Sequence, residues 1–210
     1  MTEAPSPLNR REQILEIATD LFQKGFRATS LDEVAAVMGV TRPALYYYFR
    51  SKEELLAAIY ERGVGVLLDR ASVLFADNLP PDVLLRRLIE VHVHTMLEEL
   101  PNLRVYFQEK ESLGDAASKS VKAKEVAFTK MMAKAIEAGQ AQGVFRPGEP
   151  ELIVNAILGM MIWVHEWYRP ERHAEDAISE TFWQLLTGGL VVNQGSASKA
   201  STANEAVRGR

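Results

Sequence analysis

The segment at residues 29–52, TSLDEVAAVMGVTRPALYYYFRSK, constrains the fold most strongly, because it encodes two short helices separated by a tight turn. Ser30 and Glu33 form a capping box, which predicts that the first helix begins at Leu31. Gly39 ends this helix, since glycine readily adopts the left-handed backbone that follows a helix C-terminus. A second helix follows at once, so the pattern predicts a helix-turn-helix unit.

The second helix carries three consecutive tyrosines. Successive side chains on a helix point about 100° apart, so one short helix cannot bury all three. A displayed tyrosine can hydrogen-bond a phosphate and pack on a sugar or a thymine methyl group. The pattern therefore favours a nucleic-acid surface over a generic three-helix packing unit. We expect DNA contacts from Thr29, Ser30, Thr41, Arg42, Pro43, Ala44, Tyr46, Tyr47, Tyr48 and Lys52.

The residues that flank the tyrosines support this interpretation. Thr41 is the expected N-cap, and Pro43 fits the first helical turn, where a missing N–H costs little. Arg42 stands near the helix N-terminus, where recognition helices usually touch base edges. Ser51 opens another capping box, which places Lys52 at the start of the following helix beside the same surface.

Residues 10 to about 60 resemble the DNA-binding domain of the TetR/AcrR family of bacterial transcriptional regulators. The resemblance rests on the TSLDEVA start, the Gly39–Val40 turn, and LYYYF followed by SKEEL. It implies an all-α fold of about nine helices, with a three-helix DNA-binding head and a C-terminal core for ligand binding and dimerisation. It also implies a dimer that binds a near-palindromic operator and is released by a small ligand.

Composition fits a soluble globular protein. Of the 210 residues, 47% are hydrophobic and 25% are charged, which suits one large or two small domains. The absence of cysteine excludes a disulfide scaffold and thiolate metal sites, and it is compatible with a reducing cytoplasm. The N-terminus has no apolar run typical of a signal peptide, and no apolar segment approaches the roughly 20 residues of a membrane helix. We expect a cytoplasmic protein without a membrane partner.

The charge distribution favours a dimer. The net charge is −4, but residues 1–52 hold seven basic against six acidic residues. This small excess suggests moderate affinity for DNA per subunit, which favours two subunits that read two half-sites.

The remaining helices are predicted from apolar periodicity and turn residues. We expect helices over 10–24, with Asn9 as its cap, and over 52–75, weakened at Gly63 and Gly65, followed by 82–100, 103–112, 116–142, 151–168 and 174–190. The expected domains are a DNA-binding domain at 1–53, a ligand-binding and dimerisation domain at 54–192, and a disordered tail at 193–210.

The segment 151–170, ELIVNAILGMMIWVHEWYRP, is apolar nearly all round, so it should be buried on more than one side. A two-fold interface with the following helix would bury it, and an interior helix of a monomer is the alternative. We expect the interface to include Ile157, Gly159, Met160, Phe182 and Leu186.

Large adaptable apolar residues on the later helices are together typical of pockets for apolar ligands, although for any single one core filling is the better explanation. The expected pocket residues are Met96, Tyr106, Phe107, Phe128, Met131, Met132, Trp163 and Trp167. Basic side chains available for an anionic head group are Arg104, Lys119, Lys122 and Lys124. The Trp167–Pro170 end resembles acyl-coenzyme A-responsive (FadR-like) members of the family, so an acyl-coenzyme A is the leading effector.

Other chemistries lack a motif. His92 and His94 are two apart on a helix and do not face one another, so we expect one buried and one surface histidine and no metal or cofactor. No nucleophile–base–acid arrangement is evident, so we expect no catalysis. The rival function is a helical lipid carrier or enzyme-like domain whose N-terminal unit is only structural; DNA binding at low salt distinguishes the two. The sequence does not separate a repressor from an activator.

Overall fold

The computed structural model describes residues 7–188 and, over that range, contains helices and no strands. The expected all-α fold and its order of helices are confirmed. The predicted tail at 193–210 lies outside the described residues. The elements are α1 (Pro7–Gly25), α2 (Leu31–Met38), α3 (Arg42–Tyr48), α4 (Lys52–Ala76), α5 (Pro81–Glu98), α6 (Leu100–Glu109), the 3-10 turn η1 (Lys110–Ser112), α7 (Asp115–Ala141), α8 (Pro150–Ile162), α9 (Val164–Trp167) and α10 (Glu175–Gly188).

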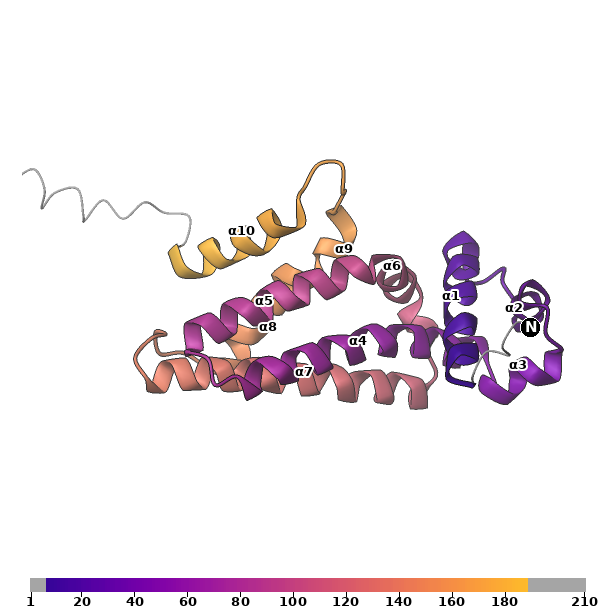
Figure 1. Ribbon diagram of the computed structural model, residues 1–210, viewed down its shortest axis with the longest axis horizontal. Coiled ribbons are helices and arrows are strands. Elements are labelled where there is room, and N and C mark those ends of the chain that lie inside the picture. Colours follow the sequence, from indigo (N-terminus) through magenta and orange to yellow (C-terminus); the bar gives the residue numbers. More distant parts are fainter. Residues whose placement is uncertain (1–6, 189–210) are drawn as a thin grey trace, which may run out of the picture.

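Helices α1, α2 and α3 form a compact head at one end of an elongated helical body (Figure 1). The head core contains Leu15, Val34 and Leu45, which are fully buried. Leu55 and Ile59, from the first turns of α4, belong to the same core. Because α4 then continues into the body without a break, head and body share one helix across the predicted domain boundary at 53/54.

Local capping explains where the head helices begin and end. The Ser30 hydroxyl accepts a hydrogen bond from Glu33 N (3.2 Å), and Gly39 has a left-handed backbone with φ of 66°. Thr41 is the N-cap residue of α3, as predicted, although its side chain makes no cap bond. One predicted cap is wrong: α1 begins at Pro7, so Asn9 lies inside the helix rather than before it.

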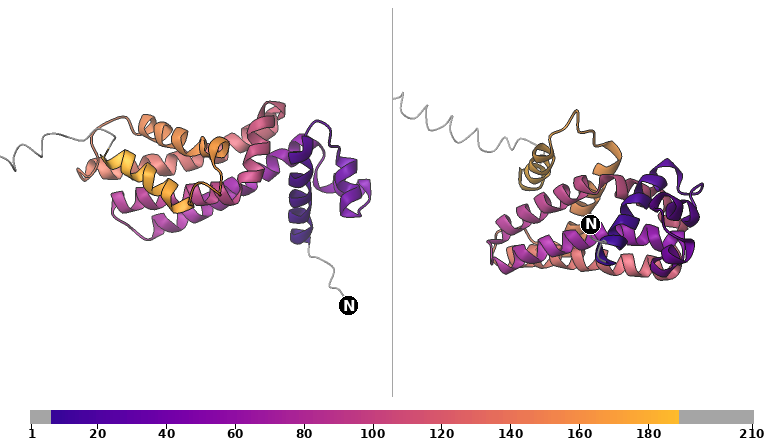
Figure 2. Two further views of the ribbon diagram at one scale, coloured as in Figure 1. Left: turned by 90° about the horizontal axis from the view of Figure 1, so that it is seen from above. Right: turned by 45° about the vertical axis from the view of Figure 1, so that its right-hand side comes forward.

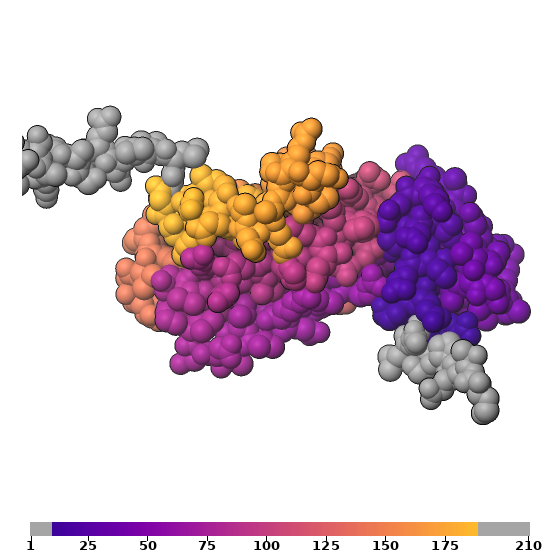
Figure 3. Space-filling model, turned by 45° about the horizontal axis from the view of Figure 1, so that its top comes forward, coloured from indigo at the N-terminus to yellow at the C-terminus, as the bar shows by residue number. Residues whose placement is uncertain are grey.

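The body packs α4, α5, α7 and α8 side by side, and α10 lies across α5 (Figures 1 and 2). Its core is made by fully buried side chains such as Leu88, Met132 and Met161. Seen as a solid surface, α10 covers the upper side of the body far from the head (Figure 3). The expected weakening of α4 at Gly63 and Gly65 does not interrupt the helix.

The predicted helix over 151–168 is divided into α8 and α9 at Trp163. At this junction the buried His165 satisfies a free carbonyl at the helix C-terminus, because its Nδ1 donates a hydrogen bond to the Ile162 carbonyl (2.6 Å). Within the described chain, no helix has both the length and the apolar character needed to cross a bilayer.

Candidate nucleic-acid interface and cavity

Helix α3 presents an exposed polar face on the outside of the head. Leu45 and Phe49 are buried and fix the helix to the head core. Tyr47 is 84% exposed and lies on the opposite side, as the three-tyrosine pattern predicts. Tyr46 and Tyr48 are half-buried, so the display of the three tyrosines is unequal. The face is completed by exposed side chains at the helix start: Thr41, Arg42, Pro43 and Ala44.

Arg42 is held in place at the N-terminus of α3. Its Nε lies 3.0 Å from a carboxylate oxygen of Asp32, and its Nη2 donates to the Tyr46 hydroxyl (3.3 Å). The Tyr46 hydrogen bond and the Asp32 charge raise the pKa of Arg42, so the guanidinium stays charged. An exposed cation held on the same short helix as the exposed Tyr47 is suited to phosphate and base-edge contacts.

Two residues expected to touch DNA have internal roles instead. Thr29 is buried, and its hydroxyl donates to the Gly25 carbonyl (3.0 Å), so it fixes the connection between α1 and α2. Lys52 Nζ donates to the Phe26 carbonyl (2.7 Å) and lies 4.4 Å from the Phe26 ring centroid. These contacts occupy the ammonium group, whereas the neighbouring Arg50, which the sequence prediction omitted, is exposed.

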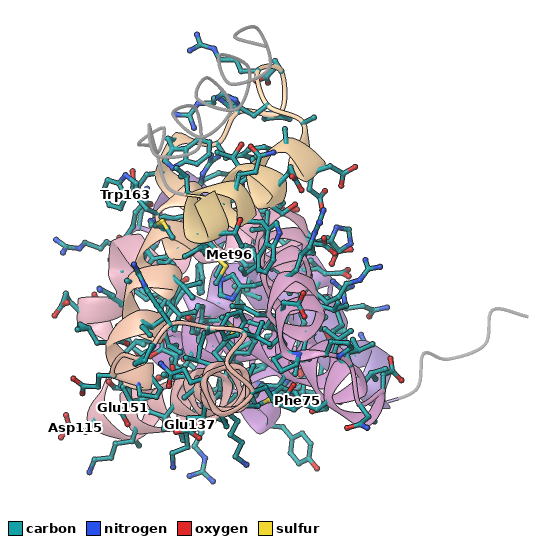
Figure 4. The ribbon with its side chains drawn as sticks, turned by 90° about the vertical axis from the view of Figure 1, so that its left-hand side faces the viewer. Phe75, Met96, Asp115, Glu137, Glu151 and Trp163 are labelled. Atoms are coloured by element: carbon teal, nitrogen blue, oxygen red, sulfur yellow. The ribbon has the colours of Figure 1, made fainter. Side chains whose placement is uncertain are left out.

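A cavity of about 340 Å³ lies among α4, α5, α6, α7 and α8. This volume is near the lower end of the range for small-molecule sites. Met96, Phe107 and Phe128 line it, as predicted, and Figure 4 shows Met96 inside the bundle. Its apolar wall also includes Val64, Leu67, Leu103, Leu158 and Ile162.

The other predicted pocket residues lie outside the cavity wall. Met132 is fully buried in the main core, with Met131 packed against that core. Tyr106 is buried and stacks on Tyr60 with ring centroids 3.5 Å apart. Trp163 and Trp167 are 61% and 37% exposed, and Figure 4 places Trp163 at the margin of the bundle. The pocket prediction is wrong for these five, because periodicity does not distinguish a cavity wall from a core or a surface.

The sequence prediction missed the polar groups of the cavity. The Tyr60 hydroxyl donates to Glu125 (3.0 Å), and burial together with the Glu125 charge raises the pKa of Tyr60. His92 is 5% exposed, and burial lowers its pKa to about 4, so it is neutral. Glu99 and Lys122 also line the cavity. These groups come from three helices, and no local motif connects them.

The basic residues considered for an anionic head group are mostly engaged elsewhere. Arg104 donates to the carbonyls of His165 (3.1 Å) and Tyr168 (3.2 Å), which caps the end of α9. Lys124 pairs with Glu61 (3.4 Å). Lys122 is 72% exposed, pairs with Glu125 at 3.6 Å and lines the cavity, so it is the basic group placed to meet a polar part of a ligand.

A polar network joins the cavity wall to the head. Arg62 of α4 pairs with Glu12 of α1 (3.2 Å) and with Glu99, the residue between α5 and α6 (3.4 Å). Glu99 also accepts a hydrogen bond from Asn102 Nδ2, and Asn102 Oδ1 accepts one from the Thr19 hydroxyl of α1 (2.6 Å). Two branches therefore run from one carboxylate in the cavity wall to α1 of the head.

The exposed side of α8 is apolar. We define the α8 face as Leu152, Ala156, Gly159 and Trp163, which recur at helical spacing and are all exposed. No atom approaches within 4 Å of a Cβ built at Gly159. Of the predicted interface residues, Ile157 is 1% exposed and Phe182 is 9% exposed. Both pack in the core of their own subunit, so they have little surface for a partner.

Met160 and Leu186, the other two predicted interface residues, are half-buried against the same core. The histidine pair behaves as its spacing predicts: His92 is buried, and His94 is exposed and pairs with Glu98 (3.0 Å). Among residues 7–188, no cluster of His, Cys, Asp and Glu side chains has the arrangement of a metal site.

Two family models match the chain. The model of bacterial regulatory proteins of the tetR family matches residues 14–59, and the model of the tetracyclin repressor-like C-terminal domain matches residues 78–190. The transcriptional repressor KstR2 of Mycolicibacterium smegmatis is 24% identical over 198 residues, covering 92% of this chain and 97% of that protein. These relatives are regulators rather than enzymes.

Solved structures agree with the sequence relatives. A TetR/AcrR-family regulator from Thermobifida fusca is 33% identical with a TM-score of 0.73, and the match covers 87% of this chain and 99% of that one. AibR in complex with isovaleryl coenzyme A and operator DNA is 24% identical with a TM-score of 0.73, covering 84% and 97%. The AibR match shows the shared fold.

Proposed function

We propose, from the premise that the chain belongs to the TetR family of bacterial transcriptional regulators, that it is a one-component repressor released from its operator by a small apolar ligand. Family membership makes it a DNA-binding regulator. The observation that carries the ligand-controlled part is the Glu99 network, because one residue of the cavity wall is linked, through Arg62 and Asn102, to α1 of the head.

DNA binding is assigned to α3. Its buried side fixes the helix to the head, and its exposed side offers Arg42 and Tyr47 to the major groove. Arg50 is placed for a phosphate contact, as a basic exposed residue just after the helix. Residues 1–52 hold seven basic and six acidic residues, so one head alone supplies limited electrostatic affinity. Two heads on a near-palindromic operator offset this weakness.

Dimerisation is assigned to the α8 face. Leu152 and Trp163 are 65% and 61% exposed, which is unusual for large apolar side chains on one helix face. Gly159, between them, lets a second helix approach closely. A second copy of the chain, packed through α8 and α10, would bury this face in a two-fold arrangement.

The effector is assigned to the cavity. The apolar wall suits an acyl chain, and each buried methylene contributes about 0.8 kcal/mol to binding. Lys122 at the wall suits the polar end, and acyl-coenzyme A is the leading candidate. AibR, which shares the fold, is described as a complex with isovaleryl coenzyme A and operator DNA. A ligand that binds more tightly to one head position than to another shifts the protein toward that position.

The test measures operator affinity by fluorescence anisotropy, using DNA from upstream of the gene, without ligand and with acyl-coenzyme A esters of increasing chain length. We expect specific binding that weakens on addition of ligand, with ligand affinity rising until the cavity is full. No DNA binding at low salt would favour the rival lipid-carrier function. Tight DNA binding that no ester changes would reject the proposed effector class.

A further inference from the structure

His92 has one ring nitrogen without a hydrogen-bond partner among residues 7–188. The side chain lies on α5, lines the cavity, and packs against Phe128 with ring centroids 5.2 Å apart. Its Nε2 lies 3.0 Å from the sulfur of Met96. Its Nδ1 is buried and has no hydrogen-bond partner within the described part of the chain. A buried polar atom without a partner is destabilising, so such atoms commonly mark functional sites.

The contact with Met96 determines which nitrogen carries the proton. A thioether sulfur is a weak acceptor and has no proton to donate. At 3.0 Å the contact is favourable only if Nε2 carries the hydrogen and donates it to the sulfur. His92 is neutral, since its burial lowers its pKa to about 4. Nδ1 is therefore unprotonated, and it is a hydrogen-bond acceptor.

Two hydroxyls of the cavity have already used their proton within the protein. The Tyr60 hydroxyl donates to Glu125, and the Thr129 hydroxyl donates to the Glu125 backbone carbonyl (3.0 Å). Lys122 and Asn155 supply donors to the lining, so an acceptor on a ligand has partners there. His92 Nδ1 instead requires a donor from the ligand.

We propose that the cavity selects apolar ligands carrying a neutral hydrogen-bond donor, a hydroxyl or an amide N–H, and that this donor binds His92 Nδ1. The inference rests on the proposed function, in that it treats the cavity as the effector site. It adds a specificity-determining residue and a chemical preference: a plain acyl chain fits the apolar wall but leaves Nδ1 without a partner, so a ligand of similar size that also carries a donor binds more tightly. Sites built to bond a ligand hydroxyl reject analogues that lack it.

The test compares two isomeric probes, para-pentylphenol and para-butylanisole, which have the same atoms but differ in the presence of a donor. Calorimetry on the full-length protein measures both affinities. We expect the phenol to bind about tenfold more tightly than the ether. In His92→Phe the preference should disappear, while in His94→Phe, which changes an exposed histidine two residues away, it should remain.

Equal affinities for the two probes, or no binding of either, would overturn the proposal, since Nδ1 would then not accept a hydrogen bond from the ligand. Imidazole nitrogen NMR of histidine-labelled wild-type protein provides a second test that does not depend on the folding of a variant. It should show an unprotonated Nδ1 on His92. The chemical shift of this nitrogen should change when the phenol is added and should not change when the ether is added. A protonated Nδ1 would contradict the assignment. Operator binding and its release by acyl-coenzyme A are measured separately, so the proposed function can stand if this inference fails.

Discussion

The head and the cavity are built in different ways. In the head, the functional side chains are fixed by contacts within a few residues, such as Ser30 to the Glu33 amide and Arg42 to Tyr46. In the body, the cavity depends on contacts between distant segments, such as Tyr60 to Glu125. A recognition surface can therefore be encoded locally, whereas a ligand site is a property of the whole helical bundle.

The two regions meet at Glu99. It faces the cavity and bonds to Arg62 and Asn102, which both contact α1 of the head. Gly63, next to Arg62, helps this meeting, because a Cβ there would lie 3.2 Å from Glu99 Cγ. The following predictions separate the contributions of the two regions, beginning with the largest expected effect.

The largest effect is expected in the body, where lowering the pH should reduce the free energy of unfolding. Folding lowers the pKa of His92 from an ordinary 6.5 to about 4, so below pH 6.5 the unfolded chain binds more protons than the folded one. The free energy of unfolding should fall as pH decreases from 6.5 to 4, by on the order of 3 kcal/mol from this residue. His92→Phe should flatten this part of the stability curve, measured by denaturant unfolding.

The matched control is His94→Phe, because His94 is exposed on the same helix. Glu99, Glu125 and Lys122 line the same cavity as His92, and they remain in both variants. If both variants lose stability with acid as the wild type does, burial of His92 is not the cause.

The next effect concerns assembly. Gly159→Leu should weaken the dimer by roughly 1–3 kcal/mol, because it overpacks a close helix contact. The subunit itself should stay folded, since nothing in it lies within 4 Å of the added Cβ. Light scattering over a dilution series measures the change, and Val73→Leu, an exposed site on α4, is the control. A wild type that is monomeric at micromolar concentration would remove the basis of the prediction.

A smaller effect is expected at the DNA surface. Tyr47→Ala should reduce operator affinity by on the order of 1 kcal/mol without changing stability, because its side chain is exposed. Tyr47→Phe separates the hydroxyl from the ring. An anisotropy titration with unchanged affinity in Tyr47→Ala would exclude this residue from the interface.

The smallest effect distinguishes two neighbouring cations. Arg50→Met should lower the slope of binding against salt by about one, as expected for a lost phosphate contact. Lys52→Met should leave that slope nearly unchanged, because Lys52 Nζ is bound to the Phe26 carbonyl. A lower slope in Lys52→Met together with an unchanged slope in Arg50→Met would show that Lys52 contacts DNA, as the sequence pattern predicts.

Features fixed by short-range contacts could be predicted from the sequence, and features that depend on contacts between distant segments could not. The caps at Ser30 and Ser51 and the turn at Gly39 are short-range signals, so the helix-turn-helix could be predicted. The internal role of Lys52 could not, because its partner lies 26 positions earlier in the chain. Similarly, Trp163 is a large apolar residue of the type that often lines pockets, and only the packing of α8 shows that it faces outward.

The central claim is that ligand in the cavity acts on the head through Glu99. The direct measurement is operator affinity with and without saturating octanoyl-coenzyme A, in the wild type and in Asn102→Leu, which removes one branch of the network. We predict that the ligand weakens operator binding of the wild type by about tenfold, within the usual range of allosteric coupling, and does so clearly less in the variant. Octanoyl-coenzyme A that binds the wild type and leaves operator affinity unchanged would contradict the account.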